Sequence, residues 1–313
     1  MKLIAVKDLY LLAIVFLIRV NWFFSLRPRS FFVKSLAFIT YRSSATKRRL
    51  SEKQLSNAFA GELCADSIRT IVKRAFHQIW HETFSIPPPG DAKISVEHLD
   101  IRGLLHLQLA INKGKGAILW ESSCFGRRLL AKQILHHYGF AVHQVHGENH
   151  FGGFGPISGP ASWVRRHLIR RFFEKCESPF VKEILYFKRR TSPAFTRVLA
   201  ARLKQNSIIC ISADARRGHK FVTVPFLGHT DYFPTAMVSL AKLTGAAILP
   251  LFCVQGSGDT VQLIIESPLP VETDGDRERS LERSITRYPS SLETYIKKYP
   301  EQYRNWNLPG GEA

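Results

Sequence analysis

The sequence is poor in acidic side chains, and its cysteines are not closely paired. Its 313 residues include 44 Lys and Arg but only 25 Asp and Glu, a formal net charge of +19. Five cysteines are scattered without a CxxC motif, so neither a disulfide framework nor a structural zinc site is expected. A hydrophobic content of 45% excludes a disordered basic tail. The charge instead indicates an anionic partner of a folded protein: a membrane surface, a nucleic acid or an acidic carrier.

Acidic residues are absent from Leu9 to Ser51. This stretch contains Arg19, Arg27, Arg29, Lys34, Arg42, Lys47, Arg48 and Arg49 among apolar and aromatic residues. The apolar run Leu9–Ile18 is about half of the roughly 20 residues that a membrane-spanning helix needs, so a span would require Arg19 to snorkel. No small-residue cleavage pattern indicates a secretory signal. We expect residues 1–50 to attach to an anionic leaflet; the alternative is a buried helix with a basic edge.

Residues 51–90 are expected to form a helical region. Between residues 66 and 84 apolar side chains recur at helical spacing, and Asp66 or Ser67 stands where a cap would be. The segment Ile86–Gly90 (IPPPG) then breaks the helix.

Residues 91–313 alternate between short β-rich runs and stretches of helix length. The runs are 117–120, 140–142, 207–211, 221–226, 246–254 and 261–265, and the expected helices are 127–138, 192–205 and 235–244. This alternation predicts an α/β domain with a mostly parallel central sheet flanked by helices. Residues 277–298 are expected to form a closing helix.

Generic catalytic and metal-binding motifs are missing. The sequence has no phosphate-binding loop, no Gly-x-Ser-x-Gly and no His-Glu-x-x-His. His143, His146 and His150 lie close together, but only Glu148 accompanies them, so we expect no metal and no cofactor. No nucleic-acid-binding fold is detectable, and a nucleic-acid partner is not expected.

Four segments, in the right order, resemble one known family. They are Gly114–Gly126 (GKGAILWESSCFG), Lys220–Gly228 (KFVTVPFLG) with Phe233–Thr235, Leu240–Pro250 (LAKLTGAAILP) and Tyr299–Trp306 (YPEQYRNW). The first segment resembles the strand and turn at the start of the active site in the late acyltransferases of lipid A biosynthesis. The other three resemble, in order, the VPFFG…TPT, TGAPVLP and HPEQWxW segments of the same family. This lauroyl/myristoyl type belongs to the lysophospholipid-acyltransferase-like superfamily.

The resemblance implies an acyltransferase mechanism whose central motif this sequence lacks. In the family, a histidine takes the proton of the acceptor hydroxyl and a carboxylate five residues later orients it (His-x4-Glu/Asp). Alignment on Phe125-Gly126 puts Cys124 and Leu129 at these two positions. A shift of one residue offers Ser123 and Arg128 instead.

Three explanations remain open. His146 lies about where the family has an arginine, and it could act as base with Glu121 or Asp214 as its partner. Alternatively, Cys124 could carry the acyl group as a thioester if its pKa fell below the usual 8.5. In the third explanation the protein is a non-catalytic relative that binds lipid or a partner enzyme. The candidate catalytic residues are therefore Cys124, Glu121, His146 and Asp214.

Several basic residues lie near the expected site. Arg127 and Arg128 begin the helix after the first motif, and Arg216 and Arg217 follow Asp214, which matches the first acid of the family's Asp-Gln-Asp. Clustered arginines suit bidentate recognition of phosphate or carboxylate. With Ser123, these four arginines are the expected substrate-binding residues; a solvated basic turn is the alternative for Arg216 and Arg217.

The sequence thus predicts an acyltransferase that moves a fatty acyl chain from an acyl carrier protein or acyl-CoA to a hydroxyl of a lipid or glycolipid. Its expected location is the cytoplasmic face of a bacterial inner membrane, where the basic N-terminus meets anionic lipid.

Overall fold

The computed structural model describes most of the chain. The described residues are 6–24, 26–91, 98–147, 162–187, 193–214, 220–256, 260–271 and 277–307.

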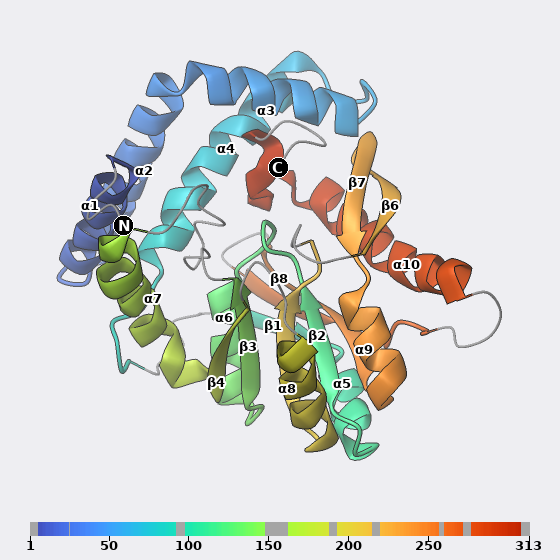
Figure 1. Ribbon diagram of the computed structural model, residues 1–313. Helices are drawn as coiled ribbons and strands as arrows, with labels where there is room; N and C mark the ends of the chain where they lie inside the picture. The colour runs from blue at the N-terminus through green and yellow to red at the C-terminus, as the bar shows by residue number, and fades with distance from the viewer. Residues whose placement is uncertain are drawn as a thin grey trace.

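Four helices form the N-terminal part and lie over one end of the molecule (Figure 1). They are α1 (Val6–Asn21), α2 (Leu26–Ser43), α3 (Ala45–Ala58) and α4 (Ala65–Phe84). The expected helix 66–84 is confirmed as α4, which buries the spaced residues Ile68, Val72 and Trp80. None of the described helices is both long and apolar enough to cross a membrane.

A seven-stranded sheet forms the centre, in the order β1-β9-β8-β2-β5-β3-β4. The strands are β1 (His98–Arg102), β2 (Ala117–Glu121), β3 (Val142–Gly147), β4 (Glu183–Phe187), β5 (Ile208–Ser212), β8 (Ala247–Gln255) and β9 (Thr260–Ile265). All neighbouring strands pair in parallel except β8 and β9, which are antiparallel. The predicted mostly parallel sheet is confirmed.

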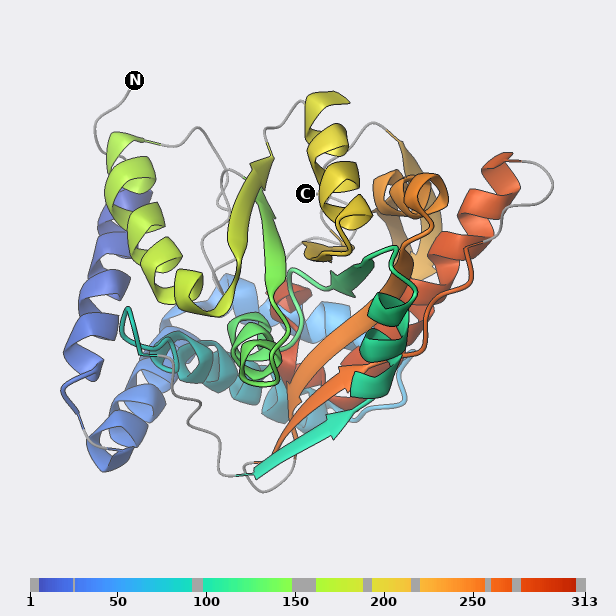
Figure 2. The ribbon, with the colours of Figure 1, turned by 90° about the horizontal axis from the view of Figure 1, so that it is seen from below.

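Helices cover both faces of the sheet (Figures 1 and 2). They are α5 (Leu104–Asn112), α6 (Arg128–His137), α8 (Pro193–Lys204), α9 (Ala236–Thr244) and α10 (Arg277–Lys298). The helix α7 (Arg170–Glu177) instead packs with the N-terminal helices. Because successive side chains of a strand point to opposite faces, Ile118 and Trp120 of β2 pack in the core on the side of α8, α9 and α10. Ala117 and Leu119 pack in the core with α5 and α6. The predicted helices flanking the sheet and the closing helix α10 are confirmed.

Some elements were not expected from the sequence. They are β1, β4, the strand β7 (His229–Pro234) that pairs with β6 (Phe221–Phe226) outside the main sheet, and a π-helical turn, η2 (Arg165–Ile169). β3 also continues to Gly147, beyond the expected run 140–142. Two short helical turns, η4 (Pro300–Gln302) and η5 (Arg304–Asn307), follow α10.

Candidate active site

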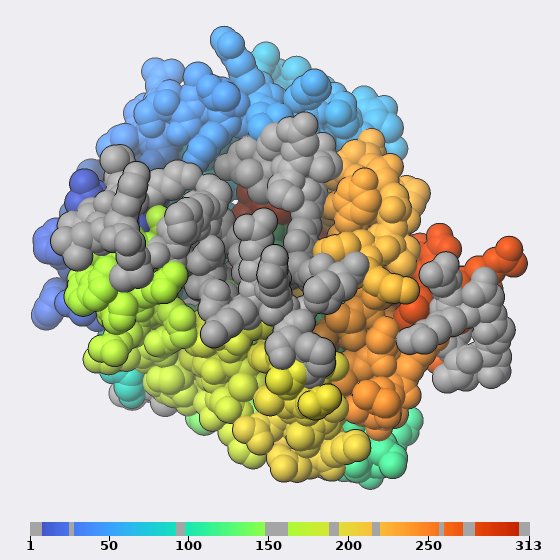
Figure 3. All heavy atoms as spheres, viewed as in Figure 1, coloured from blue at the N-terminus to red at the C-terminus, as the bar shows by residue number. Residues whose placement is uncertain are grey.

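A large pocket lies between the N-terminal helices and the ends of the central strands. Its volume is about 840 Å³. Residues of α2, α4 and the 84–88 segment form one wall, and residues 126–130, the end of β3 and the end of α7 form the other. Residues that follow the carboxyl ends of parallel strands are the usual site of ligand binding in such sheets. Figure 3 shows the N-terminal helices along the upper edge of the face viewed in Figure 1.

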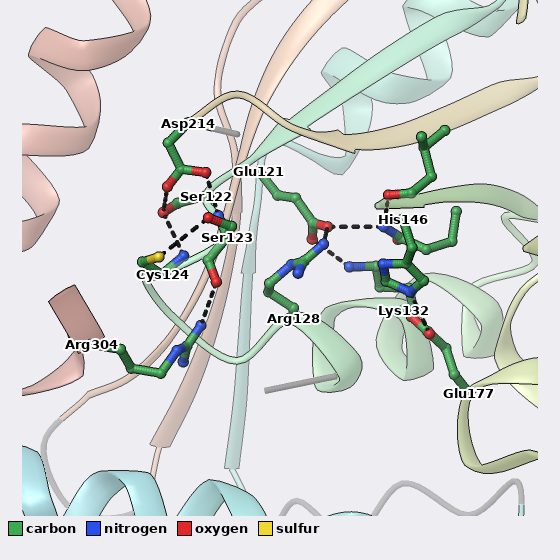
Figure 4. Close-up of polar contacts among 12 residues, drawn as sticks. Glu121, Ser122, Ser123, Cys124, Arg128, Lys132, His146, Glu177, Asp214 and Arg304 are labelled. Atoms are coloured by element: carbon green, nitrogen blue, oxygen red, sulfur yellow. Dashed lines mark hydrogen bonds and ion pairs between the residues drawn. The ribbon is translucent and has the colours of Figure 1, made fainter. Parts of the chain in front are cut away.

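His146 and Glu177 lie in this pocket and are hydrogen-bonded to each other. His146 stands near the end of β3 and Glu177 is the last residue of α7, and 2.7 Å separates His146 Nε2 from Glu177 Oε2 (Figure 4). Burial opposes ionisation of Glu177. The charge and hydrogen bond of His146, with the charges of Lys132 and Arg128, outweigh burial and hold the pKa of Glu177 below its usual value. Glu177 is therefore an ionised orienting partner for the imidazole.

Glu121 belongs to a different group of charges. It is buried at the end of β2 and forms ion pairs with Arg128 and Lys132, and Gln144 donates to it at 3.1 Å (Figure 4). Burial disfavours the carboxylate, but the two cations lower the pKa of Glu121 far below its usual value. The expectation that Glu121 pairs with His146 is corrected: the hydrogen-bond partner of His146 is Glu177.

Asp214 fixes the loop after β2 and is not the partner of His146 either. It accepts a hydrogen bond from the Ser122 hydroxyl and one from the Ser123 backbone N–H, the latter at 2.6 Å. Ser123 is itself buried and does not line the pocket, and its Oγ lies 3.2 Å from Cys124 Sγ. Asp214 thus acts on the shape of the loop.

Cys124 lies beneath the pocket wall. It is buried, is not among the pocket-lining residues, and burial together with the charge of Asp214 raises the pKa of its thiol to about 11. A thiol with such a pKa is almost wholly protonated at neutral pH, so its environment disfavours the thiolate that a thioester route needs.

The arginines expected near the site have different surroundings. Arg127 and Arg128 both line the pocket. Arg127 Nη1 donates to Gln255 Oε1 at 2.9 Å, whereas Arg128 is paired with Glu121. Arg216 and Arg217 lie outside the described residues.

Arg304, which the sequence analysis did not select, joins three parts of the site. Its Nη1 lies 2.6 Å from Glu82 Oε2 of α4 and donates to the Gly126 carbonyl at 2.9 Å. Its backbone N–H donates to the Cys124 carbonyl at 2.8 Å. The chain after α10 therefore braces the loop between β2 and α6 against α4.

Other residues in and beside the pocket also went unselected. Glu177 and Lys132 carry no local motif. His77 and Glu82 of α4 do have the His-x4-Glu spacing and line the pocket, a signal that was available in the sequence. That spacing occurs here on a helix, and Glu82 is engaged by Arg304. Within the described ranges, no three His, Cys, Asp or Glu side chains are grouped so that they could hold a metal ion.

Sequence comparisons relate the chain to known acyltransferases. Residues 184–306 match the model of the bacterial lipid A biosynthesis acyltransferase family. The phosphatidylinositol mannoside acyltransferase of Mycolicibacterium smegmatis is 28% identical over 223 residues, 71% of this chain and 66% of that protein. Its counterpart in Mycobacterium tuberculosis H37Rv is 29% identical over 188 residues, 57% of this chain and 52% of that protein.

The chain is thus similar to the lipid A biosynthesis acyltransferases over residues 184–306 and to the two mycobacterial acyltransferases over a longer stretch. It spans about two-thirds and about half of the lengths of these curated relatives. The family match begins after Cys124 and His146, so the loss of the His-x4-Glu/Asp motif stays a prediction. The crystal structure of the 1-acyl-sn-glycerophosphate acyltransferase PlsC from Thermotoga maritima shares 12% identity, with a TM-score of 0.39, over 87% of this chain and 97% of that one.

Proposed function

We propose that this protein is an acyltransferase that moves a fatty acyl chain from an acyl thioester to a hydroxyl of a lipid or glycolipid. The donor is an acyl carrier protein or acyl-CoA. The observation that carries the proposal is the hydrogen-bonded pair His146–Glu177 inside a pocket of about 840 Å³. The family relationship supports the same chemistry, since the relatives named above are acyltransferases of phosphatidylinositol mannosides.

His146 is the general base of the proposed reaction. The imidazole of His146, oriented by its hydrogen bond to ionised Glu177, takes the proton of the acceptor hydroxyl. The hydroxyl oxygen attacks the thioester carbonyl and forms a tetrahedral intermediate. Collapse of this intermediate forms the ester and breaks the C–S bond, and the leaving thiolate receives the proton from His146.

The decisive experiment measures transfer of a labelled acyl chain from acyl-CoA and from acyl carrier protein into total bacterial lipid. We expect His146→Ala to lower the rate about 100-fold or more, because a positioned base contributes roughly 10²–10⁴-fold. Glu177→Gln should lower kcat with little change in KM, and Glu177→Asp should restore part of it. His137→Ala is the matched control, since this exposed histidine of α6 does not line the pocket.

A non-catalytic lipid-binding role is the second candidate. The specific observation in its favour is the burial of Cys124, the residue that the sequence resemblance aligns with the family's catalytic histidine. If the wild-type protein transfers no acyl chain and hydrolyses no thioester from either donor, yet binds lipid, this candidate replaces the first.

We also propose that α1 and α2 rest on an anionic membrane, at the cytoplasmic face of a bacterial inner membrane. Large apolar side chains are exposed on these helices and the turn between them: Leu9, Tyr10, Phe16, Phe23, Phe24, Phe31, Phe32, Phe38 and Ile39. Arg19 and Arg42 are exposed among them, and residues 9–51 contain no acidic side chain. Apolar side chains beside positive charge suit the interface of an anionic bilayer.

Flotation with lipid vesicles tests this surface. Binding should be stronger to phosphatidylglycerol than to phosphatidylcholine vesicles and should weaken as salt increases. The double variant Phe23→Ser/Phe31→Ser should bind more weakly. Leu105→Ser/Leu243→Ser, which removes two equally exposed apolar side chains from α5 and α9, should not. The proposal is contradicted if both double variants lose the same amount of vesicle binding, or if binding is equally strong to phosphatidylglycerol and phosphatidylcholine vesicles.

A further inference from the structure

The pocket contains more positive charge than its own carboxylates balance. Five Lys and Arg side chains line it, against the three carboxylates Glu82, Asp91 and Glu177; the five are Arg29, Lys34, Arg127, Arg128 and Arg304. Arg128 is paired with Glu121 and Arg304 with Glu82. In the part of the chain that the structure describes, the other three form no ion pair with a carboxylate.

The three remaining cations are placed by neutral groups. Arg29 Nε donates to Asn21 Oδ1 at 3.2 Å, and Arg127 Nη1 donates to Gln255 Oε1 at 2.9 Å. An amide oxygen orients a guanidinium but leaves its charge uncompensated, and the remaining N–H groups can bind an anion. Lys34 is exposed and lies five residues after Arg29 on α2.

Two side chains on this wall have lowered pKa values. Burial lowers the pKa of the Arg29 guanidinium. Burial also lowers the pKa of His77 of α4, and the positive charge of Lys34 lowers it further. The positive charge of Lys34 therefore acts on His77, a residue that lines the pocket.

Apolar side chains line the pocket next to these cations. Val33 stands between Arg29 and Lys34 on the same wall, and Ile79, Phe84 and Leu129 also line the pocket. Such a pocket suits an amphipathic ligand with an aliphatic part and a compact, multiply charged anion. A phosphate group fits this description, because its several oxygens can accept from guanidinium and ammonium donors together.

We propose that Arg29, Lys34 and Arg127 form a subsite for the phosphate group of a substrate. This inference rests on the proposed acyl transfer for its biological meaning. The phosphate can come from two sources: the diphosphate and phosphate of a coenzyme A donor, or the headgroup of a phospholipid acceptor. In both cases α2, which carries the apolar surface described above, also holds the ligand.

Calorimetric binding to the purified full chain in detergent tests the subsite without requiring turnover. The donor arm compares coenzyme A with pantetheine, which has no phosphate. The acceptor arm compares dihexanoylphosphatidylglycerol with dihexanoylglycerol. We expect Arg29→Gln/Lys34→Gln, and separately Arg127→Gln, to weaken binding of a phosphate-bearing ligand about tenfold or more while leaving its phosphate-free counterpart unchanged.

The matched control is Arg42→Gln/Lys47→Gln, which removes two exposed cations of the N-terminal helices that do not line the pocket. A loss confined to coenzyme A assigns the subsite to the donor, and a loss confined to the phospholipid assigns it to the acceptor. The proposal is overturned if the wild-type protein binds neither phosphate ligand, if the pocket variants bind as tightly as wild type, or if the control loses as much affinity. Phosphate binding without acyl transfer would leave the subsite standing and overturn the proposed function alone.

Discussion

Arg165 and Asp8 form a buried ion pair that joins the first helix to the π-helical turn. Arg165 Nη2 lies 2.8 Å from Asp8 Oδ1, and the two side chains are 2% and 0% exposed. The turn leads directly into α7 and so to Glu177. The pair therefore fixes α1, with its exposed apolar side chains, against the element that ends in the candidate active site.

We expect Asp8→Ala to lower the free energy of unfolding by about 3–5 kcal/mol, because it leaves the Arg165 charge buried without its partner. Asp8→Leu/Arg165→Leu should restore much of the loss. Urea denaturation followed by circular dichroism measures both. The control is Arg69→Gln, which removes an exposed pair with Asp66 and should cost less than about 1 kcal/mol. An Asp8→Ala protein as stable as that control would show that the buried pair does not hold α1 in place.

The cysteines should differ in reactivity with pH. The pKa of Cys124 is raised to about 11, so at pH 7–9 its thiol stays protonated in the folded protein, and its alkylation should accelerate only as the pH approaches 11. Cys64 is exposed, and hydrogen bonds with Ser67 lower the pKa of its thiol. Mass spectrometry after brief treatment with iodoacetamide at pH 7.5 should find Cys64 modified and Cys124 intact. Urea should abolish the difference; rapid modification of Cys124 in the native protein would revive the thioester route.

Glu121→Gln should destabilise the protein by several kcal/mol, because Arg128 and Lys132 are buried beside it and would lose the carboxylate with which both form ion pairs. The cost should depend on pH. The lowered pKa of Glu121 stabilises the folded state above the unfolded-state value near 4, and this contribution is lost as the pH falls toward the folded pKa. Denaturation midpoints of wild type and Glu121→Gln should therefore converge in acid. A constant difference between pH 7 and pH 2 would contradict this account.

Gly126→Ala should disturb the loop that lines the pocket. Gly126 has a φ of +72°, and a Cβ there would lie 2.5 Å from the Cys253 carbonyl oxygen. Gly139 has a similar φ of +82°, but a Cβ would meet nothing within 4 Å, so Gly139→Ala isolates the strain of positive φ, about 1 kcal/mol. Thermal unfolding should show a clearly larger loss at Gly126 than at Gly139, together with weaker ligand binding. An equal loss of thermal stability in the two variants would mean that the contact of a Cβ at residue 126 with β8 costs nothing.

Local patterns predicted most of the fold. The spacing of Ile68, Val72 and Trp80 identified α4, because a helix that buries one face repeats its apolar residues at helical spacing. Short β-rich runs identified β2, β5, β8 and β9, because a fully buried strand consists of consecutive apolar residues. β4 was missed: its side chains are mostly half-buried, and only its parallel pairing with β3 defines it as a strand.

The site was predicted less completely, for a physical reason. His146 was selected from its place after a strand, but its partner Glu177 comes from a helix 31 residues later, and only the packing of α7 brings them together. Asp214 and Glu121 looked equally suitable in the sequence. The serines of the β2 loop engage Asp214, and the cations of α6 engage Glu121.

The last described segment has a consequence for how the molecule is made. Residues after α10 contribute the Arg304 contacts to Ser123, Gly126 and Glu82, and Gln302 binds the end of β8 through both side-chain amide atoms. The ribosome synthesises these residues after all the elements that they join. The growing chain can therefore form its sheet before the loop between β2 and α6 is braced, and residues 302–304 complete the pocket wall only after every strand of the sheet has been made.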